Sequence, residues 1–141
     1  MGAEIVSQVE ALFPCPPERV WAVVTDLERW QWRSDLRRLD HAGDDAFTEY
    51  GKSGFPTRFT VTDRRPPARW AFDIDNANLT GRWTGEFRPE GGGTRVTFTE
   101  TIAVKKPWMR LFVRGYLRRQ QARYLADLRR ALEAGKSNGK N

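Results

Sequence analysis

The chain has 141 residues and a formal net charge of +6, with 39% hydrophobic and 30% charged side chains. This balance is typical of a globular protein rather than a disordered or membrane-embedded one, and no apolar run approaches the about 18 residues that cross a bilayer. Cys15 is the only cysteine, so an internal disulfide is excluded, and without a secretory signal we expect a cytoplasmic protein.

The first part of the chain predicts one strand and two short helices. Apolar and polar residues alternate over 4–12, which is typical of a strand. The two prolines of "CPPE" favour the start of a helix, and the apolar residues after them recur at helical spacing. Asp26 is expected to cap a second short helix that runs through Trp32.

The middle of the chain predicts six more strands, because its hydrophobic period becomes two. Turn residues separate the apolar stretches in "AGDD", "GKSG", "RRPPA", "DNAN" and "PEGGG". Since these connections are short, consecutive strands should pair in antiparallel fashion. The expected strands are 37–41, 46–50, 57–63, 69–75, 79–88 and 94–104.

The C-terminal segment is basic and predicts one long helix. From residue 105 onward the chain carries 11 basic and 2 acidic side chains, a net charge of +9, whereas the preceding residues carry −3. The helix should begin at Pro107 and end near Gly135. We expect residues 1–135 to form a single domain, followed by a disordered tail, 136–141.

The apolar residues of this helix fall on two faces. The second face begins at Leu117 and is turned by roughly a quarter circle from the first, at about 100° per residue. A bend or a change of face is therefore expected near Gly115. The first face carries Trp108, Met109, Phe112, Val113 and Tyr116.

This order of elements resembles the helix-grip fold. With "PPERVWAVVTDLERWQWRSDL", "RRPPARWAF" and "GGGTRVTFTETI", the chain is similar to the polyketide cyclase/dehydrase and lipid-transport superfamily, the START and Bet v 1-like (SRPBCC) group. The resemblance covers residues 3 to 134. It implies an α+β fold in which a seven-stranded, curved antiparallel sheet wraps around the long C-terminal helix and leaves a mostly apolar pocket. It implies a ligand site but not one activity, because this fold serves many functions.

One carboxylate interrupts the apolar face of the last strand. Val96, Phe98, Ile102 and Val104 share that face, and Glu100 stands among them. Burying an unpaired carboxylate costs several kcal/mol, about the whole margin of stability. Glu100 should therefore be paired, protonated or wet inside a cavity, unless the strand end twists out to solvent.

We expect the chain to bind a hydrophobic or aromatic small molecule, lipid-like or polyketide-like, between the sheet and the final helix. Glu100 would be the polar anchor of this pocket, and Trp32 would stand near its entrance. The expected ligand-binding residues are Trp32, Phe59, Trp70, Phe72, Trp83, Phe98, Glu100, Phe112 and Tyr116.

Two other functions stay open. In a cyclase or dehydratase, Glu100 would act as acid or base with a pKa raised by burial, and Tyr116 would donate a hydrogen bond. In an interaction module, the basic helix would bind a partner. Its arginines are also what a solvated helix back looks like, so we expect at most weak contact with an anionic surface.

Metals, cofactors and nucleic acids are not expected partners. The chain has one histidine, His41, and one cysteine, too few soft ligands for a zinc, iron or copper site. The basic helix has no stacking aromatics interleaved with its arginines and no recognised reader motif, which argues against specific nucleic-acid binding.

Overall fold

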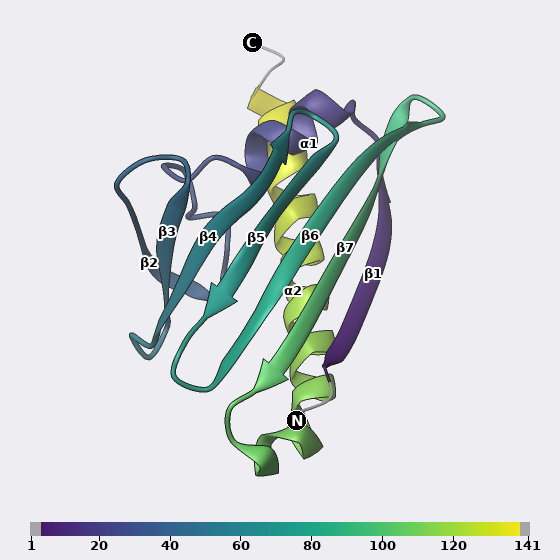
Figure 1. The fold of residues 1–141 in the computed structure, drawn as a ribbon. Coiled ribbons are helices and arrows are strands. Elements are labelled where there is room, and N and C mark those ends of the chain that lie inside the picture. Colours follow the sequence, from purple (N-terminus) through teal and green to yellow (C-terminus); the bar gives the residue numbers. More distant parts are fainter. Residues whose placement is uncertain (1–3, 139–141) are drawn as a thin grey trace.

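The structure, a computed structural model, describes residues 4–138 and consists of one antiparallel sheet with a long helix packed against it (Figure 1). The sheet has the order β1-β7-β6-β5-β4-β3-β2, so β1 and β2 are its edges. The strands are β1 (Ile5–Phe13), β2 (Leu36–His41), β3 (Ala46–Gly51), β4 (Pro56–Arg65), β5 (Arg69–Asp75), β6 (Leu79–Glu90) and β7 (Gly93–Val104). The helices are α1 (Pro17–Val24), the one-turn helix η1 (Pro107–Met109) and α2 (Arg110–Asn138). The predicted helix-grip architecture is confirmed.

Tight connections give the sheet its antiparallel order. Between β6 and β7 the chain reverses through Gly91 and Gly92, whose φ angles are 54° and 82°. Glycine adopts this left-handed conformation without strain, so "PEGGG" makes a two-residue hairpin turn. After its hairpin with β6, β7 also pairs along its other side with β1.

The core lies between the sheet and α2 (Figure 1). Alternate residues of each strand point toward α2, and Phe87, Phe98 and Ile102 are among the most deeply buried. Leu117 and Leu128 of α2 meet them from the other side. α1 contacts β6, β7 and α2 near one end of the sheet.

The second short helix expected after α1 does not form. Residues 25–35 are all described, and they contain turns but no helix. The Asp26 side chain accepts hydrogen bonds from the backbone N–H groups of Glu28 and Arg29, at 3.0 and 3.1 Å. This local capping closes a turn, and the chain then extends toward β2 instead of continuing as a helix.

The expected change of face near Gly115 is wrong. Helix α2 runs through Gly115, and its buried residues form one stripe at helical spacing, which comprises Val113, Leu117, Gln121, Asp127, Leu128 and Leu132. The helix also passes Gly135 and continues to Asn138, so the first residues of the expected tail are helical. Positions 139–141 of that tail lie outside the described residues.

Most of the first apolar face expected for this helix is exposed, and only Val113 of it is buried in the core. The exposed fractions are 62% for Trp108, 64% for Phe112 and 48% for Tyr116, and 83% for the neighbouring Leu111. This part of the helix lies at the end of the sheet, where few strand residues can cover it (Figure 1). Across the described residues, no helix combines the length and the apolarity needed to cross a bilayer.

Candidate functional site

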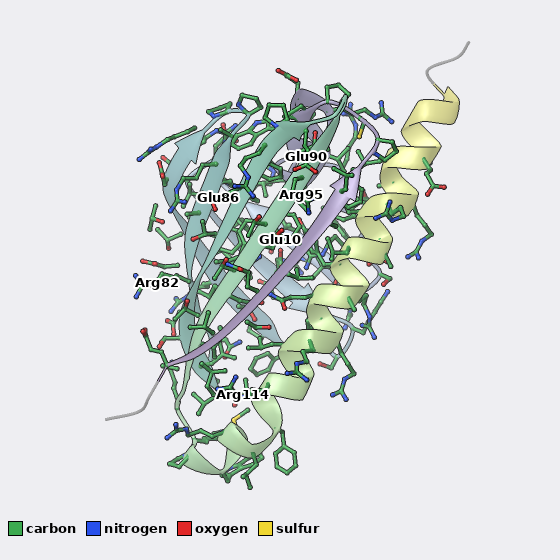
Figure 2. The ribbon with its side chains drawn as sticks, turned by 90° about the vertical axis from the view of Figure 1, so that its right-hand side faces the viewer. Glu10, Arg82, Glu86, Glu90, Arg95 and Arg114 are labelled. Atoms are coloured by element: carbon green, nitrogen blue, oxygen red, sulfur yellow. The ribbon has the colours of Figure 1, made fainter. Side chains whose placement is uncertain are left out.

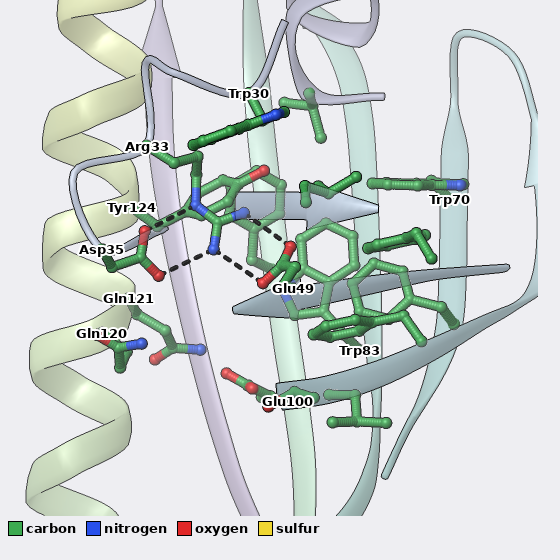
Figure 3. Close-up of a pocket in the computed structure, with 18 of the residues that line it drawn as sticks. Trp30, Arg33, Asp35, Glu49, Trp70, Trp83, Glu100, Gln120, Gln121 and Tyr124 are labelled. Atoms are coloured by element: carbon green, nitrogen blue, oxygen red, sulfur yellow. Dashed lines mark hydrogen bonds and ion pairs between the residues drawn. The ribbon is translucent and has the colours of Figure 1, made fainter. Parts of the chain in front are cut away.

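A pocket of about 170 Å³ lies between the inner face of the sheet, the first half of α2 and the connection 25–35 (Figure 3). Its sheet side is aromatic, and its α2 side is mixed, with Leu117 next to glutamines and tyrosines. The aromatic residues of the sheet that line it are Phe47, Phe59, Trp70, Phe72, Trp83 and Phe98.

Strand register assembles the aromatic wall. Phe72 of β5 is paired with Trp83 of β6, and their rings stack with centroids 4.9 Å apart. Phe47 and Phe59 are paired across β3 and β4 in the same way, with centroids 4.8 Å apart. Such cross-strand aromatic pairs stabilise a sheet by about 0.2–1 kcal/mol each. The wall is therefore fixed by the fold whether or not a ligand is present.

The two glycines beside Trp83 have different roles, and only Gly85 makes room for the indole ring. A Cβ atom added at Gly85 would lie 2.5 Å from the Trp83 indole. The space that glycine leaves at this position is thus filled by the neighbouring side chain and not by a ligand. At Gly81 an added Cβ would lie 2.4 Å from the carbonyl oxygen of Thr101, so glycine there permits close approach of β6 and β7.

The polar end of the pocket is built around Arg33. Its Nε and Nη2 atoms donate to the Asp35 carboxylate at 3.0 and 2.9 Å. Its Nη1 and Nη2 atoms donate to the Glu49 carboxylate at 3.1 and 3.2 Å. The guanidinium also lies over the ring of Tyr124, 4.9 Å from its centroid. Two forked ion pairs therefore hold one arginine between the connection, β3 and α2 (Figure 3).

The connection that carries Arg33 is tied to α2 by a buried carboxylate. Asp127 accepts hydrogen bonds from the backbone N–H and the hydroxyl of Ser34, at 2.7 and 2.8 Å. It also pairs with Arg130 one turn further along the helix. These bonds set the position of Arg33 relative to the pocket, since Ser34 is its neighbour in the chain.

The environment of this cluster favours the ionised forms of Arg33 and Asp35 and the neutral form of Tyr124. Burial alone would lower the pKa of Arg33, but the Glu49 and Asp35 carboxylates outweigh it and raise that pKa. Burial would raise the pKa of Asp35, but its hydrogen bonds and charge interaction with Arg33 lower it below its usual value. Burial is the main cause that raises the pKa of Tyr124, so this phenol stays protonated.

Glu100 lines the pocket without a partner. Within residues 4–138 its carboxylate has no hydrogen bond and no ion pair. Its neighbour across the sheet is Trp83, which is paired with it in the register of β6 and β7. Burial and then the negative charge of Glu49 raise its pKa from 4.5 to about 7, while Arg33 acts in the opposite direction. Of the states expected from the sequence, Glu100 is therefore partly protonated at neutral pH, and it is not paired.

The expected site residues come together with one exception. Phe112 lies outside the pocket and is exposed, because it belongs to the uncovered start of α2. Tyr116, one turn further along, lines the pocket and is also about half exposed. The expected residues that line the pocket are Trp32, Phe59, Trp70, Phe72, Trp83, Phe98, Glu100 and Tyr116.

Arg33, Asp35 and Glu49 were not predicted from the sequence. Glu100 was the carboxylate singled out on the inner face of the sheet, and the structure adds Glu49 of β3 to the same pocket. Glu49 carried the same signal as Glu100, because it follows the inward Phe47 by two residues on one strand. No grouping of three or more potential metal ligands occurs within residues 4–138.

Solved structures share this fold at low sequence identity. A conserved protein from Geobacillus kaustophilus is 13% identical with a TM-score of 0.80, covering 92% of this chain and 96% of that one. A START superfamily protein from Mycobacterium smegmatis is 12% identical with a TM-score of 0.80, covering 93% and 97%. A protein from Thermus thermophilus is 21% identical with a TM-score of 0.76, covering 93% and 99%. Identities in this range show a common fold alone.

Comparison with curated proteins gives no significant match. The family model described as polyketide cyclase / dehydrase and lipid transport, in contrast, matches residues 4–133. This match spans the sheet, the pocket and nearly all of α2. The chain belongs to the polyketide cyclase/dehydrase and lipid transport family.

Proposed function

We propose that the protein binds a small aromatic or otherwise apolar molecule in the pocket between the sheet and α2. The observation that carries this proposal is an aromatic wall that faces the Glu100 carboxylate, which has no partner among the described residues. A solid core would leave no such carboxylate without a partner, because the cost of burying it would go uncompensated.

The volume of the pocket limits the size of the ligand that it can hold. Cavities of about 150 Å³ hold a molecule as large as benzene, whereas drug-sized ligands occupy about 300–1,000 Å³. A volume of about 170 Å³ therefore suits a one-ring molecule. A complete lipid or polyketide would require lining side chains to move, and the partly exposed aromatic residues of the lining, Trp30, Trp32 and Tyr116, are the candidates to do so.

Titration with one-ring probes tests this function. Binding of benzyl alcohol should quench or shift the fluorescence of Trp70 and Trp83 in a saturable way. Gln120→Trp places a bulky ring into the pocket from α2 and should abolish binding, while Phe112→Ala, outside the pocket, should leave it unchanged. Circular dichroism confirms that both variants are folded. Absence of saturable binding to folded wild type, by calorimetry as well as fluorescence, would refute the proposal.

A second candidate function is acid–base catalysis by Glu100. The specific observation is that Glu100 lines the pocket together with Tyr116 and has no partner among the described residues. Burial raises its pKa to about 7, and a catalytic acid or base works best when its pKa is near the working pH. Tyr116 lines the same pocket, and burial together with the Glu100 charge raises its pKa, so that its phenol remains a hydrogen-bond donor. Loss of turnover of a hydroxyketone substrate in Glu100→Gln, with affinity retained, would support catalysis. Binding without turnover in the wild type would exclude it for that substrate.

A further inference from the structure

The groups that line the pocket carry an excess of negative charge. Among the lining residues that the structure describes, Arg33 is the only cation, whereas carboxylates are supplied by Asp26, Asp35, Glu49 and Glu100. Arg33 is already shared between Asp35 and Glu49 through four hydrogen bonds. No described cation of the pocket therefore remains to receive an anionic ligand, whereas the Glu100 carboxylate remains to receive a cation.

The aromatic wall adds to this preference. The faces of Trp and Phe rings carry partial negative charge and attract ammonium groups by about 0.5–2 kcal/mol. Trp83 stacks on Phe72 and approaches Phe98, with ring centroids 4.9 and 5.0 Å apart. The stacking covers the Trp83 and Phe72 faces that touch each other. Because Trp83 is also paired with Glu100 across the sheet, aromatic side chains and the carboxylate border the same space.

We propose that the pocket selects a cationic amine, an ammonium group on a small aromatic or aliphatic body, and rejects organic anions. This inference rests on the proposed binding function and specifies the charge of the ligand. The ammonium group donates hydrogen bonds to Glu100, which has no other partner among the described residues, and the aromatic side chains that line the pocket surround the rest of the ligand. An organic carboxylate in the same place faces Glu100 and Glu49 and is repelled.

Three probes of nearly equal size and different charge test the proposal: benzylamine, benzyl alcohol and benzoate. Calorimetry at about pH 8 keeps the amine protonated and Glu100 mostly ionised. Benzylamine should bind about tenfold more tightly than benzyl alcohol, and benzoate should bind at least tenfold more weakly than the alcohol. In Glu100→Gln the advantage of benzylamine over benzyl alcohol should disappear. Glu86→Gln, which removes a carboxylate from the outer face of β6, is the matched control and should leave all three affinities unchanged.

The same titration also measures how many protons are released when benzylamine binds. At about pH 6, one unit below its pKa, Glu100 is mostly protonated, so benzylamine binding should release close to one proton, whereas binding at about pH 8 should release little. The Glu100→Gln variant separates this proton from those of the other groups that line the same space. These other titratable or charged groups are Asp26, Arg33, Asp35, Glu49, Tyr116 and Tyr124.

The outcomes distinguish the proposed binding function from the proposed preference for cationic ligands. If none of the three probes binds, the proposed function itself fails. If the probes bind with equal affinity, or benzoate binds best, pocket binding stands and the charge preference is overturned.

A second inference rests on a different surface, which we call the α2 entry patch. It consists of exposed Trp108, Leu111 and Phe112 with four cations around them, Lys105, Lys106, Arg110 and Arg114. Figure 2 shows Arg114 near the start of α2. Residues 101–126 contain no acidic side chain. Within the described part of the chain, Lys105 pairs with Asp75, but Arg110 and Arg114 have no ion pair.

We infer that the α2 entry patch docks on the surface of a bilayer that contains anionic phospholipid. Trp, Phe and Leu side chains partition into the headgroup region, and each nearby Lys or Arg adds about 1 kcal/mol on an anionic surface. Pairing of two copies through this patch would bring the arginines of both copies together, which disfavours a dimer. This inference goes beyond the weak contact expected of a solvated helix back, because Trp108, Leu111 and Phe112 are exposed beside the cations.

Vesicle sedimentation tests the docking at physiological salt. The protein should bind phosphatidylcholine vesicles that contain phosphatidylglycerol and should not bind phosphatidylcholine alone. The double change Trp108→Ala with Phe112→Ala should weaken binding at least about tenfold, while Leu12→Ala, another exposed apolar residue, should not. Equal binding by the double variant, or no binding by the wild type, would overturn the inference. A dimer in solution that the double variant dissociates would assign the patch to a second copy instead.

Discussion

Replacing Glu100 with glutamine should make the folded protein more stable at neutral and alkaline pH. Glutamine keeps the shape of the side chain and removes a charge that has no partner within the described residues. The pKa of Glu100 rises from 4.5 to about 7 on folding, and each tenfold change in an acid dissociation constant corresponds to about 1.4 kcal/mol. The ionised carboxylate therefore costs the folded state about 3 kcal/mol once the pH is above both values.

The sign of the pH dependence follows from the same pKa values. Between about pH 4.5 and pH 7 the folded protein holds a proton on Glu100 that the unfolded chain has released. Stability therefore falls as the pH rises through this window, because the unfolded state binds fewer protons. The difference in unfolding free energy between Glu100→Gln and wild type should be small at about pH 4.5 and should reach about 3 kcal/mol at about pH 8.

Urea denaturation of both proteins at the two pH values measures this difference directly. Other titrating groups are common to both proteins and cancel when the two curves are subtracted. Glu86→Gln serves as the control, because this carboxylate is on the outer face of β6, and the variant should show no such pH-dependent gain. A Glu100→Gln difference that stays the same at both pH values would refute the argument that Glu100 is desolvated in the pocket.

Four further changes test the scaffold of the site, each by urea denaturation. Arg33→Met leaves the carboxylates that it binds without a counter-charge and should destabilise the fold by about 3–5 kcal/mol. Gly81→Ala should lower the free energy of unfolding by about 1–3 kcal/mol, because the added Cβ would lie 2.4 Å from a backbone carbonyl oxygen of the neighbouring strand. Gly115→Ala should stabilise α2 by about 0.5–1 kcal/mol, since nothing lies within 4 Å of the added Cβ. Asp127→Ala should cost about 1–3 kcal/mol and should accelerate hydrogen exchange at the Ser34 amide, which loses its acceptor. Unchanged stability of Arg33→Met, Gly81→Ala or Asp127→Ala would contradict the contact described for that residue. A loss of stability in Gly115→Ala would contradict the open space described at that position.

The sheet and its aromatic wall could be predicted because their signals are local. Alternation with period two places Trp70 and Phe72, the neighbours of Ala71, on the same face, and turn residues fix where each strand ends. The carboxylate at Glu100 was visible for the same reason, as a break in an otherwise apolar row. Glu49 could have been found by this rule, because Phe47 precedes it by two residues on the same strand.

The Arg33 cluster and the start of α2 could not be predicted in this way. Arg33 lies in a connection without periodicity, and its position depends on contacts with β3 and with Asp127, far away in the chain. For α2, periodicity showed two apolar faces but not which of them the sheet covers. The face with Leu117 is covered, and the one with Phe112 extends beyond the strands.

The position of Glu100 has a consequence for how the family can diversify. Its inward direction is set by the register of β7, in which Val96, Phe98 and Ile102 are buried on the same side. A slip by one residue would expose all of them. The direction of the side chain at position 100 is therefore fixed by the register of the whole strand and needs no hydrogen bond from that side chain. Under the proposed function, exchange of this residue for another of similar volume changes which ligand the pocket prefers, while the register of the strand stays the same. A single codon change at position 100 would then alter ligand preference without first rebuilding the sheet.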